Sequence, residues 1–486
     1  MKLKAKWKIA SSVVLTFAVA GTVSAASIIQ GTPAPEVKYT WNGQAVEPSK
    51  PAVEIDDSLY MPLRAIAELT GQYVDYDDYR RSVALTDKPQ LTGKYQLEAP
   101  DLADGVKMGV GSSLTHIPGD PSNVFYTTAD RGPNGEVEVG GETRRTFPLE
   151  KYNPSLYKIE INNGKITILE TIPLKVSGVN PATGSGAITG KPNIEGRDET
   201  PYDASAQTKL SYDPYGLDIE GLAYNAKDDT FWISEEYGPS IVQAKRDGTI
   251  VQRIVPQGWA SQVATPLVPA RETLPAAYLK LRSNRGAEAV GITPDGNWMF
   301  MAMQSPLRNP DKSVDGSRQL RIIKIDLNTL KPVGEFVYQA EDASKFKDVK
   351  QADIVISDLV AVNENVLLVD ERDKFSGEAA QLKRIYAVGL SNATNVLGRF
   401  DDAAAAGKTL EQMTAADLRA QGVAPVSKHT VIDAVEFGFP FEKIEGLSLI
   451  NGDTIAIIND NDFGIGSESA ANGTELWTFK LPYVIE

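Results

Sequence analysis

The chain has 486 residues, of which 42 % are hydrophobic and 23 % charged, an ordinary globular composition with room for about two or three domains. The 64 acidic residues outnumber the 49 basic ones, and the net charge of −15 disfavours nucleic acid and anionic lipid as partners and favours cations. The absence of cysteine excludes disulfides, thiolate metal sites and thiol nucleophiles, and two histidines are too few for a three-histidine metal site.

Residues 1–25 have the pattern of a secretory signal peptide. Lysines at alternate positions from 2 to 8 precede an apolar run at 9–20, and the small residues Val23-Ser24-Ala25 follow. The run is shorter than the roughly 20 apolar residues that a spanning helix needs, and no later segment is long enough either. We therefore expect a secreted protein, extracellular or at the cell surface, with no transmembrane segment in its mature chain and with calcium abundant around it.

Residues 37–90 predict a small α+β domain. Asn42-Gly43 signals a hairpin turn, a short helix at 65–69 is ended by Gly71, and strand signals follow at 73–76 and 81–85. The run Leu59-Tyr60-Met61-Pro62-Leu63-Arg64-Ala65-Ile66-Ala67-Glu68 resembles the copper-amine-oxidase-like N-terminal domain, a stalk domain of secreted bacterial proteins. Because the segment has no histidine or cysteine, we expect no copper there, but a structural role or noncovalent attachment to the cell envelope.

From about residue 105 onward the chain repeats a unit of two apolar strands. The first strand begins with an acidic or hydroxyl residue, as in segments 219–223, 287–291, 357–361, 444–448 and, more weakly, 111–115. The second strand ends in polar residues, as in segments 124–131, 231–236, 299–304, 367–372 and 455–460. Short strands in groups of about four, separated by Asn-Gly and Asp-Gly turns, are typical of β-propeller blades.

We therefore predict a mainly β fold over residues 105–486, a β-propeller with five or six blades in which residues 94–97 supply a closing strand to the last blade. An open β-sandwich is the alternative. It leaves unexplained why acidic residues recur at the same position of each unit.

The repeated acids predict a funnel of carboxylates at one mouth of the central channel. In an antiparallel hairpin the start of one strand and the end of the next lie at the same edge, so these side chains gather there. Two carboxylates about 5 Å apart repel by roughly 3 kcal/mol at an effective dielectric near 20, so cations, arginines or protons must compensate. We expect divalent cations, Ca²⁺ in particular, with the metal ligands Glu220, Glu288, Asp358, Asp370, Glu445 and Asp460.

Arginines offer another way to neutralise the same carboxylates. Arg131, Arg285 and Arg372 lie within a few residues of the acidic positions, so salt bridges between strand ends are the alternative to bound cations. Other catalytic patterns fail: there is no Gly-x-Ser-x-Gly elbow, phosphate loop or His-Glu-x-x-His. His116, near Ser112 and Ser113, is the better candidate for a serine–histidine pair, but a lone histidine beside a strand is more often structural.

Several peptides carry a closer resemblance. They are Thr128-Ala129-Asp130-Arg131-Gly132-Pro133-Asn134-Gly135, Phe231-Trp232-Ile233-Ser234-Glu235-Glu236-Tyr237-Gly238-Pro239-Ser240-Ile241, Asn284-Arg285-Gly286-Ala287-Glu288 and Ile444-Glu445-Gly446-Leu447. They resemble the phytase-like family called "esterase-like activity of phytase", over about residues 105–486. The resemblance implies phosphoesterase chemistry, and with the repeat it gives the candidate catalytic residues Asp130, Arg131, Glu220, Glu235, Glu236, Arg285, Glu288 and Glu445.

The expected function is therefore metal-assisted hydrolysis of small phosphate esters by a secreted propeller. In this hypothesis the cations bridge the substrate phosphate to the acidic protein, and Arg131 and Arg285 steady the developing charge. Two alternatives stay open: a metal-dependent lactonase or carboxylesterase on the same fold, and a non-catalytic propeller that binds a polymer or partner at the cell surface.

Overall fold

A computed structural model describes residues 31–41, 44–103, 105–263, 266–465 and 473–486, and the predicted signal peptide lies outside these residues. The chain divides into two compact units. The first runs up to Tyr76 and includes Val83–Asp87, and the second comprises Asp77–Ser82 and Lys88–Glu486. Among the described residues, no helix has both the length and the apolar character needed to cross a membrane.

The first unit combines one helix with short strands. Helix α1 (Leu63–Thr70) begins after Pro62 and ends at Gly71, whose φ of 74° is left-handed and therefore suits glycine. The strands are β1 (Thr32–Pro33), β2 (Tyr39–Trp41), β3 (Gln44–Val46), β4 (Val53–Ile55), β5 (Ser58–Tyr60), β6 (Gln72–Asp77) and β7 (Ser82–Asp87). The mixed α+β content matches the expectation for this segment, while its relation to the copper-amine-oxidase-like domain stays a prediction.

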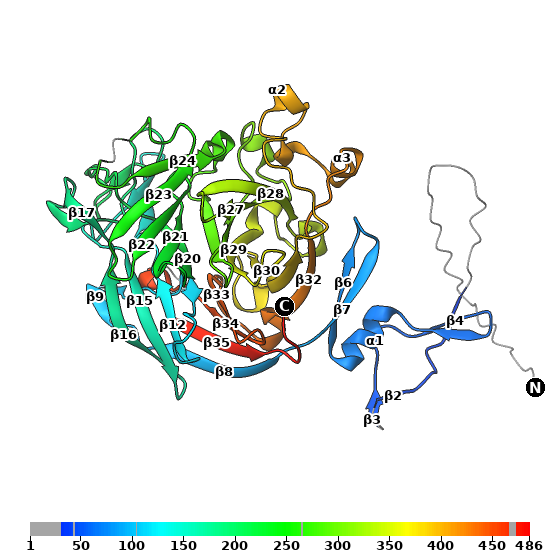
Figure 1. The fold of residues 1–486 in the computed structure, drawn as a ribbon. Helices are drawn as coiled ribbons and strands as arrows, with labels where there is room; N and C mark the ends of the chain where they lie inside the picture. The colour runs from blue at the N-terminus through cyan, green and yellow to red at the C-terminus, as the bar shows by residue number, and fades with distance from the viewer. Residues whose placement is uncertain (1–30, 42–43, 104, 264–265, 466–472) are drawn as a thin grey trace, which may run out of the picture. The chain divides into compact units, whose positions relative to one another are not determined.

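The second unit is mainly β, with its strands in five groups (Figure 1). From the innermost strand outward, the first group is β11 (Leu114–Thr115), β12 (Val124–Thr128), β15 (Ser155–Asn162) and β16 (Lys165–Pro173), and the second is β20 (Ile219–Asn225), β21 (Thr230–Glu235), β22 (Ser240–Lys245), β23 (Ile250–Pro256) and β24 (Ala270–Leu274). The third group is β25 (Ala287–Ile292), β26 (Trp298–Met303), β27 (Gln319–Asp326) and β28 (Lys331–Gln339), and the fourth is β29 (Val355–Ala361), β30 (Val366–Arg372), β31 (Lys383–Gly389) and β32 (Ser427–Asp433). The fifth group is β33 (Gly446–Ile450), β34 (Thr454–Ile458) and β35 (Thr474–Lys480), with β8 (Gln90–Leu97) from earlier in the chain as its outermost strand.

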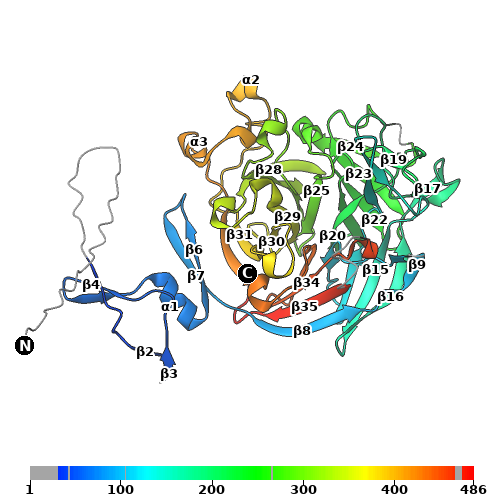
Figure 2. The same cartoon turned by 180° about the vertical axis from the view of Figure 1, so that it is seen from behind.

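The innermost strands of the five groups form a ring. Strand β11 contacts β20, β20 contacts β25, β25 contacts β29, β29 contacts β33, and β33 contacts β11 again. Within each group successive strands are antiparallel, except that β24 pairs with β23 in parallel. This is the arrangement of a propeller-like fold, seen from behind in Figure 2. The number of blades stays a prediction.

Strand β8 joins the two ends of the second unit. It pairs antiparallel with β35 from Gln90 opposite Lys480 to Leu97 opposite Thr474, and in parallel with β16 at Gln96 and Leu97. The first and last groups are therefore parts of one sheet of eight strands. Residues 94–97 supply a closing strand, as the sequence predicts.

The remaining strands and α-helices lie in the connections within and between the strand groups. They are β9 (Asp101–Ala103), β10 (Val106–Lys107), β13 (Gly135–Val139), β14 (Glu142–Thr146), β17 (Lys175–Asn180), β18 (Ser185–Ala187), β19 (Pro201–Tyr202), α2 (Ala403–Ala406) and α3 (Ala415–Ala420). Strand β19, in the connection from β16 to β20, pairs in parallel with β14, in the connection from β12 to β15.

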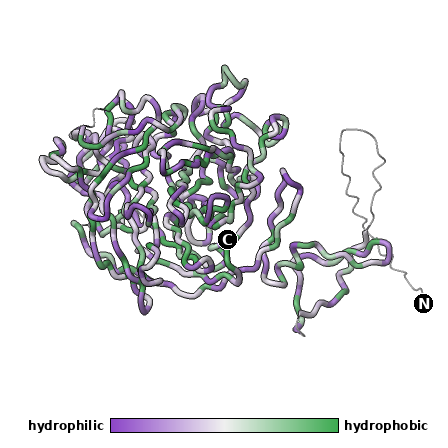
Figure 3. Tube along the Cα trace, in the orientation of Figure 1, coloured by the Kyte–Doolittle hydropathy of each residue, from purple (hydrophilic) through white to green (hydrophobic). Residues whose placement is uncertain are grey.

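Glycines allow the innermost strands to approach closely. A Cβ atom on Gly221 would lie 2.8 Å from the Glu288 carbonyl oxygen, and one on Gly446 would lie 2.7 Å from the Ser113 backbone. Apolar side chains of neighbouring groups fill the space between them, and hydrophobic stretches recur along these strands in Figure 3. Gly221 directly follows Glu220 and Gly446 directly follows Glu445, so the close packing of the strands also brings these acidic residues towards one another.

The innermost strands line a cavity of about 330 Å³, which we call the apolar cavity after its five innermost aliphatic residues, although Thr115, His116 and Ser448 also line it. Its walls come from all five innermost strands, beginning with Leu114, Leu222, Val290, Leu359 and Leu447. These residues follow the acidic positions by one or two places, so the cavity lies deeper in the ring than the acids.

Candidate functional site

Carboxylates from four of the five strand groups gather where the innermost strands begin. We call them the acidic funnel, and its members are Asp130, Asp218, Glu220, Glu236, Glu288, Glu445 and Asp460. Each member lies close enough to Asp218, Glu220, Glu288 or Asp460, or is itself one of these four, for their charges to influence one another. All but Asp130 are at least nine-tenths buried.

Three of these carboxylates form a compact triad. One oxygen each of Asp130, Asp218 and Glu220 lies within 4.8 Å of the others. Asp218 is fully buried, and neither of its oxygens accepts a hydrogen bond from the described part of the chain. The sequence analysis missed Asp218, although it stands two residues before Glu220, a spacing that places extended residues on one side of a strand.

Arg131 is the positively charged side chain that pairs with the triad. Its Nη1 atom lies 3.1 Å from Asp218 Oδ2 and 3.2 Å from Glu199 Oε2, and its Nε lies 3.6 Å from Asp130 Oδ1. The guanidinium also donates to Asn284. When all three carboxyl groups are ionised, the single positive charge of Arg131 leaves the triad with a net negative charge.

Burial makes the ionised forms of the triad costly. It raises the pKa of Glu220 well above the ordinary value, and the neighbouring carboxylates of Glu288 and Glu236 raise it further. The pKa of Asp218 is also raised by burial, which outweighs the attraction of Arg131. Burial opposes ionisation of Asp130 too, but the hydrogen bond with Asp218 and the charge of Arg131 leave its pKa below the ordinary value. Of the two carboxyl groups, Asp218 therefore has the higher affinity for a proton.

Glu236 lies beside the triad. Burial raises its pKa from 4.5 to about 7, against the opposing charge of Arg131 and the hydrogen bond that the Gly286 backbone N–H donates to Glu236 Oε1 at 3.0 Å. This carboxyl group therefore changes its protonation near neutral pH.

Glu288 completes this side of the funnel. Burial raises its pKa well above the ordinary value, with further contributions from Glu236 and Glu445. Gln304 donates to its Oε1 atom at 2.5 Å.

Ion pairs neutralise the opposite side of the funnel. Arg372 donates from Nη2 to Glu445 Oε1 at 2.7 Å and from Nε to Ser357 Oγ at 2.8 Å. Lys443 Nζ lies 3.3 Å from Asp460 Oδ2 and 3.7 Å from Glu445 Oε2. Lys443 was not among the expected residues, because it stands outside the repeated strands.

Arg285 differs from the other funnel cations. It is half-buried and close to Glu236, Glu288 and Arg372, and burial followed by repulsion from Arg372 lowers its pKa. Among the described residues, no carboxylate oxygen lies within ion-pair distance of its guanidinium. Arg285 is therefore available to an anionic ligand.

Three expected site residues have other surroundings. Glu235 is fully buried and accepts from Arg253 Nη2 at 2.8 Å and from the Tyr237 N–H at 2.9 Å. Asp358 accepts from the backbone N–H groups of Leu359 at 2.8 Å and Leu447 at 2.7 Å, which ties β29 to β33.

Asp370 is the third of these residues. It is fully buried, and both of its oxygens lack a hydrogen-bond partner in the described chain. Burial raises its pKa well above the ordinary value despite the charges of Arg372 and Lys383. Roles in metal binding or catalysis for Glu235, Asp358 and Asp370 stay predictions.

The serine–histidine pair is not formed. His116 Nδ1 lies 2.9 Å from the Val124 carbonyl oxygen, and the ring packs edge-on against Phe125. Ser113 Oγ instead lies 2.6 Å from Thr128 Oγ1. His116 also lines the apolar cavity rather than the acidic funnel.

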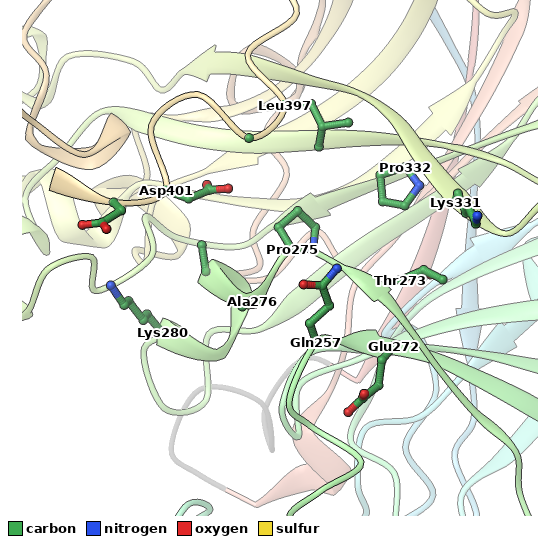
Figure 4. A pocket seen from close by; sticks show the side chains of 13 residues that line it. Gln257, Glu272, Thr273, Pro275, Ala276, Lys280, Lys331, Pro332, Leu397 and Asp401 are labelled. Carbon is green, nitrogen blue, oxygen red and sulfur yellow. The ribbon is translucent and has the colours of Figure 1, made fainter. Parts of the chain in front are cut away.

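A separate cleft has a volume of about 820 Å³ (Figure 4). Its walls come from β24, the 3₁₀ turn Ala276–Lys280, the start of β28 and the segment before α2. Pro275, Pro332 and Leu397 give it a partly apolar lining, with Lys280 and Asp401 at one side. No funnel residue contributes to it.

Comparison with known proteins connects this geometry to a family. The family model named phytase-like, with the description "Esterase-like activity of phytase", matches residues 108–463. The chain belongs to this family. The match spans the triad, Glu236, Arg285, Glu288 and Glu445, as the resemblance of their peptides implies.

A curated relative is an "Uncharacterized secreted protein" from Arthroderma benhamiae, which is 28 % identical over 258 residues. The match covers 47 % of this chain and 48 % of the relative, so the chain spans about half the length of the curated protein it matches. This secreted relative confirms the expected localisation outside the cell.

Solved structures with some similarity to this chain include the WD40 repeats of RRP9, with 10 % identity and a TM-score of 0.34 over 82 % of this chain and 99 % of the other. The aldose sugar dehydrogenase of Streptomyces coelicolor, in its PQQ-bound form, has 9 % identity and a TM-score of 0.34 over 81 % of this chain and 99 % of the other.

Proposed function

We propose that the protein is a secreted hydrolase of small phosphate esters, a five-bladed propeller whose acidic funnel binds a divalent cation, Ca²⁺ in particular. The observation that carries this proposal is the triad of Asp130, Asp218 and Glu220, with two Asp218 oxygens that no protein group donates to. The family description, esterase-like activity of phytase, supports the reaction class.

The triad fits a hard cation in its chemistry. Ca²⁺ prefers carboxylate oxygens, and buried acceptors without donors leave their desolvation uncompensated until a cation or proton arrives. Arg131 neutralises only part of the charge. The ring carries no histidine, so an oxygen-binding metal suits it better than zinc.

Four residues of the acidic funnel, together with the neighbouring Arg285, then have three tasks. Asp130, Asp218 and Glu220 hold the cation, which when bound polarises a phosphoryl oxygen and makes a bound water more acidic. Arg285 binds the phosphate because its guanidinium has no carboxylate partner among the described residues. Glu236 holds or releases a proton at Oε2, since Gly286 occupies Oε1 and a pKa of about 7 is suited to proton transfer.

A substrate panel tests the proposal. A phosphomonoester, a phosphodiester and a lactone are assayed with Ca²⁺ and with a chelator, and we expect hydrolysis of the phosphate esters that the chelator abolishes. Calcium-dependent hydrolysis of the lactone alone would support the lactonase alternative. Inactivity on the whole panel by a folded protein would overturn the enzymatic proposal.

Arg285→Gln separates phosphate binding from general damage. Losing a charge-assisted hydrogen bond costs about 1.5–3 kcal/mol, so KM for phosphate esters should rise about tenfold or more. Arg282→Gln, three residues away and also half-buried, is the matched control and should leave KM unchanged. Equal effects of the two changes would contradict the role of Arg285.

A second candidate function is ligand binding without catalysis. The pairs of Arg131 with Asp218 and of Arg372 with Glu445 close part of the funnel, as expected of a binding propeller. The first unit would then attach the protein noncovalently to the cell envelope, as a copper-amine-oxidase-like stalk domain. This candidate predicts calcium-independent folding and no turnover.

A further inference from the structure

We infer that the funnel contains a second cation site, formed by Glu288 and the side-chain carbonyl of Gln304 and sharing Glu220 with the triad. This inference rests on the proposed function, since it adds a second ion to the same funnel. Gln304 stands at the polar end of the second repeated strand and had no role in the sequence analysis.

Two buried oxygens without donors mark the site. Gln304 Nε2 donates to Glu288 Oε1 at 2.5 Å, which fixes the two side chains against each other. Glu288 is 1 % exposed and Gln304 is 7 % exposed. Glu288 Oε2 and Gln304 Oε1 nevertheless have no hydrogen-bond partner in the described chain. Such orphaned acceptors are uncommon in folded proteins and require an occupant.

The chemistry of the two oxygens favours a cation. Both are acceptors only, and a carboxylate with an amide carbonyl is a ligand pair that Ca²⁺ commonly takes in proteins. A proton on Glu288 is one alternative occupant, because an Oε2–H group pairs with an amide by donating to its carbonyl oxygen while the amide N–H donates to Oε1. A buried water that donates to both oxygens is the other alternative.

Backbone packing places this pair beside the triad. Ser234 Oγ donates to the Glu288 carbonyl oxygen at 3.0 Å, so β21 and β25 are tied together at this level. Gly221, next to Glu220, leaves no room for a side chain against the same carbonyl. Glu220 itself accepts no hydrogen bond from the described residues, although it is 9 % exposed.

A carboxylate between two cation sites is typical of two-metal hydrolases. There, two ions stabilise the attacking and the leaving oxygens of one displacement. Glu220 lies with Asp130 and Asp218 in the triad and is also close enough to Glu288 for the two carboxylates to repel, so we infer that it is the shared ligand.

The test is the number of calcium ions bound by the full-length mature chain, measured by isothermal titration and native mass spectrometry with Ca²⁺ as the only ligand. We expect two ions in the wild type, one in Gln304→Met, and one in Asp218→Asn. Gln319→Met is the matched control, because Gln319 is also buried but both its amide atoms have partners. It should still bind two ions.

A second variant keeps the inference testable if Gln304→Met does not fold. Gln304→Glu adds a negative ligand, and we expect the Kd of the weaker ion to fall about tenfold, since affinity follows ligand charge. One ion in the wild type, or unchanged binding in a folded Gln304 variant, would overturn the second site and favour a proton or a buried water. Two bound ions with no ester hydrolysis would overturn only the proposed function.

Discussion

Buried ionisable side chains in the second unit have two kinds of surroundings. Glu235 is matched by Arg253 and by backbone donors, whereas Asp218 and Glu220 lie among other carboxylates. The matched residue stabilises the fold only while its partner is present. Asp218 and Glu220, which lie crowded among other carboxylates, destabilise the fold when they are ionised and no cation is bound. Replacing them with neutral residues should therefore not lower the stability of the metal-free protein.

Arg253→Met tests the matched kind. Removing one partner leaves Glu235 buried and uncompensated, which typically costs about 3–5 kcal/mol of unfolding free energy. Urea denaturation should therefore show a much lower midpoint, while calcium still raises the stability of the variant. A midpoint close to that of the wild type would contradict a structural role for this pair.

Asp218→Asn tests the crowded kind. In the wild type, calcium at about a hundredfold excess over Kd should stabilise the fold by about 2.7 kcal/mol, so a chelator should lower the melting temperature. The variant should melt no lower than the wild type without metal and should lose much of its response to calcium. Asp229→Asn, on a side chain that is 65 % exposed, is the control and should respond fully. An undiminished response in Asp218→Asn would rule out the triad as the site.

The pKa of Glu236 gives a pH dependence with a defined sign. Its value rises from 4.5 to about 7 on folding, so the folded state binds the proton more tightly than the unfolded state. The metal-free protein should therefore gain stability as pH falls from about 8 to about 5, with Glu220 and Asp218 acting in the same direction. Melting curves across this range should show a smaller trend in Glu236→Gln. A metal-free protein that gains stability with rising pH would contradict the assignment.

At the scale of elements, Asp358 shows how an acidic residue inside an innermost strand can serve the fold, because β29 begins at Val355, before the start that the repeat predicts. Its two oxygens accept from Leu359 and Leu447, and so it bridges β29 and β33 within the ring. Asp358→Ala should leave two buried amides without acceptors, at about 1–3 kcal/mol each. Chemical denaturation should report this loss, and calcium titration of the folded variant should match the wild type. A loss of bound calcium would instead support Asp358 as a ligand.

The sequence predicts the position of the acidic strand starts better than their roles. Glu220, Glu288 and Glu445 meet because each stands at or directly before the first residues of a tightly packed innermost strand, and that pattern is visible in the repeat. The neighbours Glu235 and Glu236 could not be separated, because adjacent residues point to opposite sides and only the fold decides which side faces the funnel. Asp218, Lys443 and Gln304 have no signature of their own, since their importance arises from contacts between distant segments.

At the scale of the whole molecule, the second unit contains β8 and also the short segment Asp77–Ser82, which lies before the last boundary at Asp87. A chain that begins at Lys88 keeps β8 but loses that segment and the hydrogen bond from Arg80 Nη2 to the Pro425 carbonyl oxygen at 2.7 Å, so it should melt only slightly lower and keep the calcium response. A chain that begins at Ala99 lacks β8, which exposes the edges of β35 and β16, and it should melt lower and aggregate. Differential scanning fluorimetry and size-exclusion chromatography compare the two. Similar behaviour of both chains would contradict the closing role of β8.

The pairing of β8 with β35 also determines when the ring can close. Thr92 donates to the Thr478 carbonyl oxygen, a partner 386 positions away in the chain. Because synthesis runs from the amino end to the carboxyl end, β8 cannot pair with β35 until nearly the whole chain has been made. Such a long-range contact makes folding slow and leaves strand edges uncovered during that time. The ring, and with it the acidic funnel, is therefore completed only after the last strand has been synthesised.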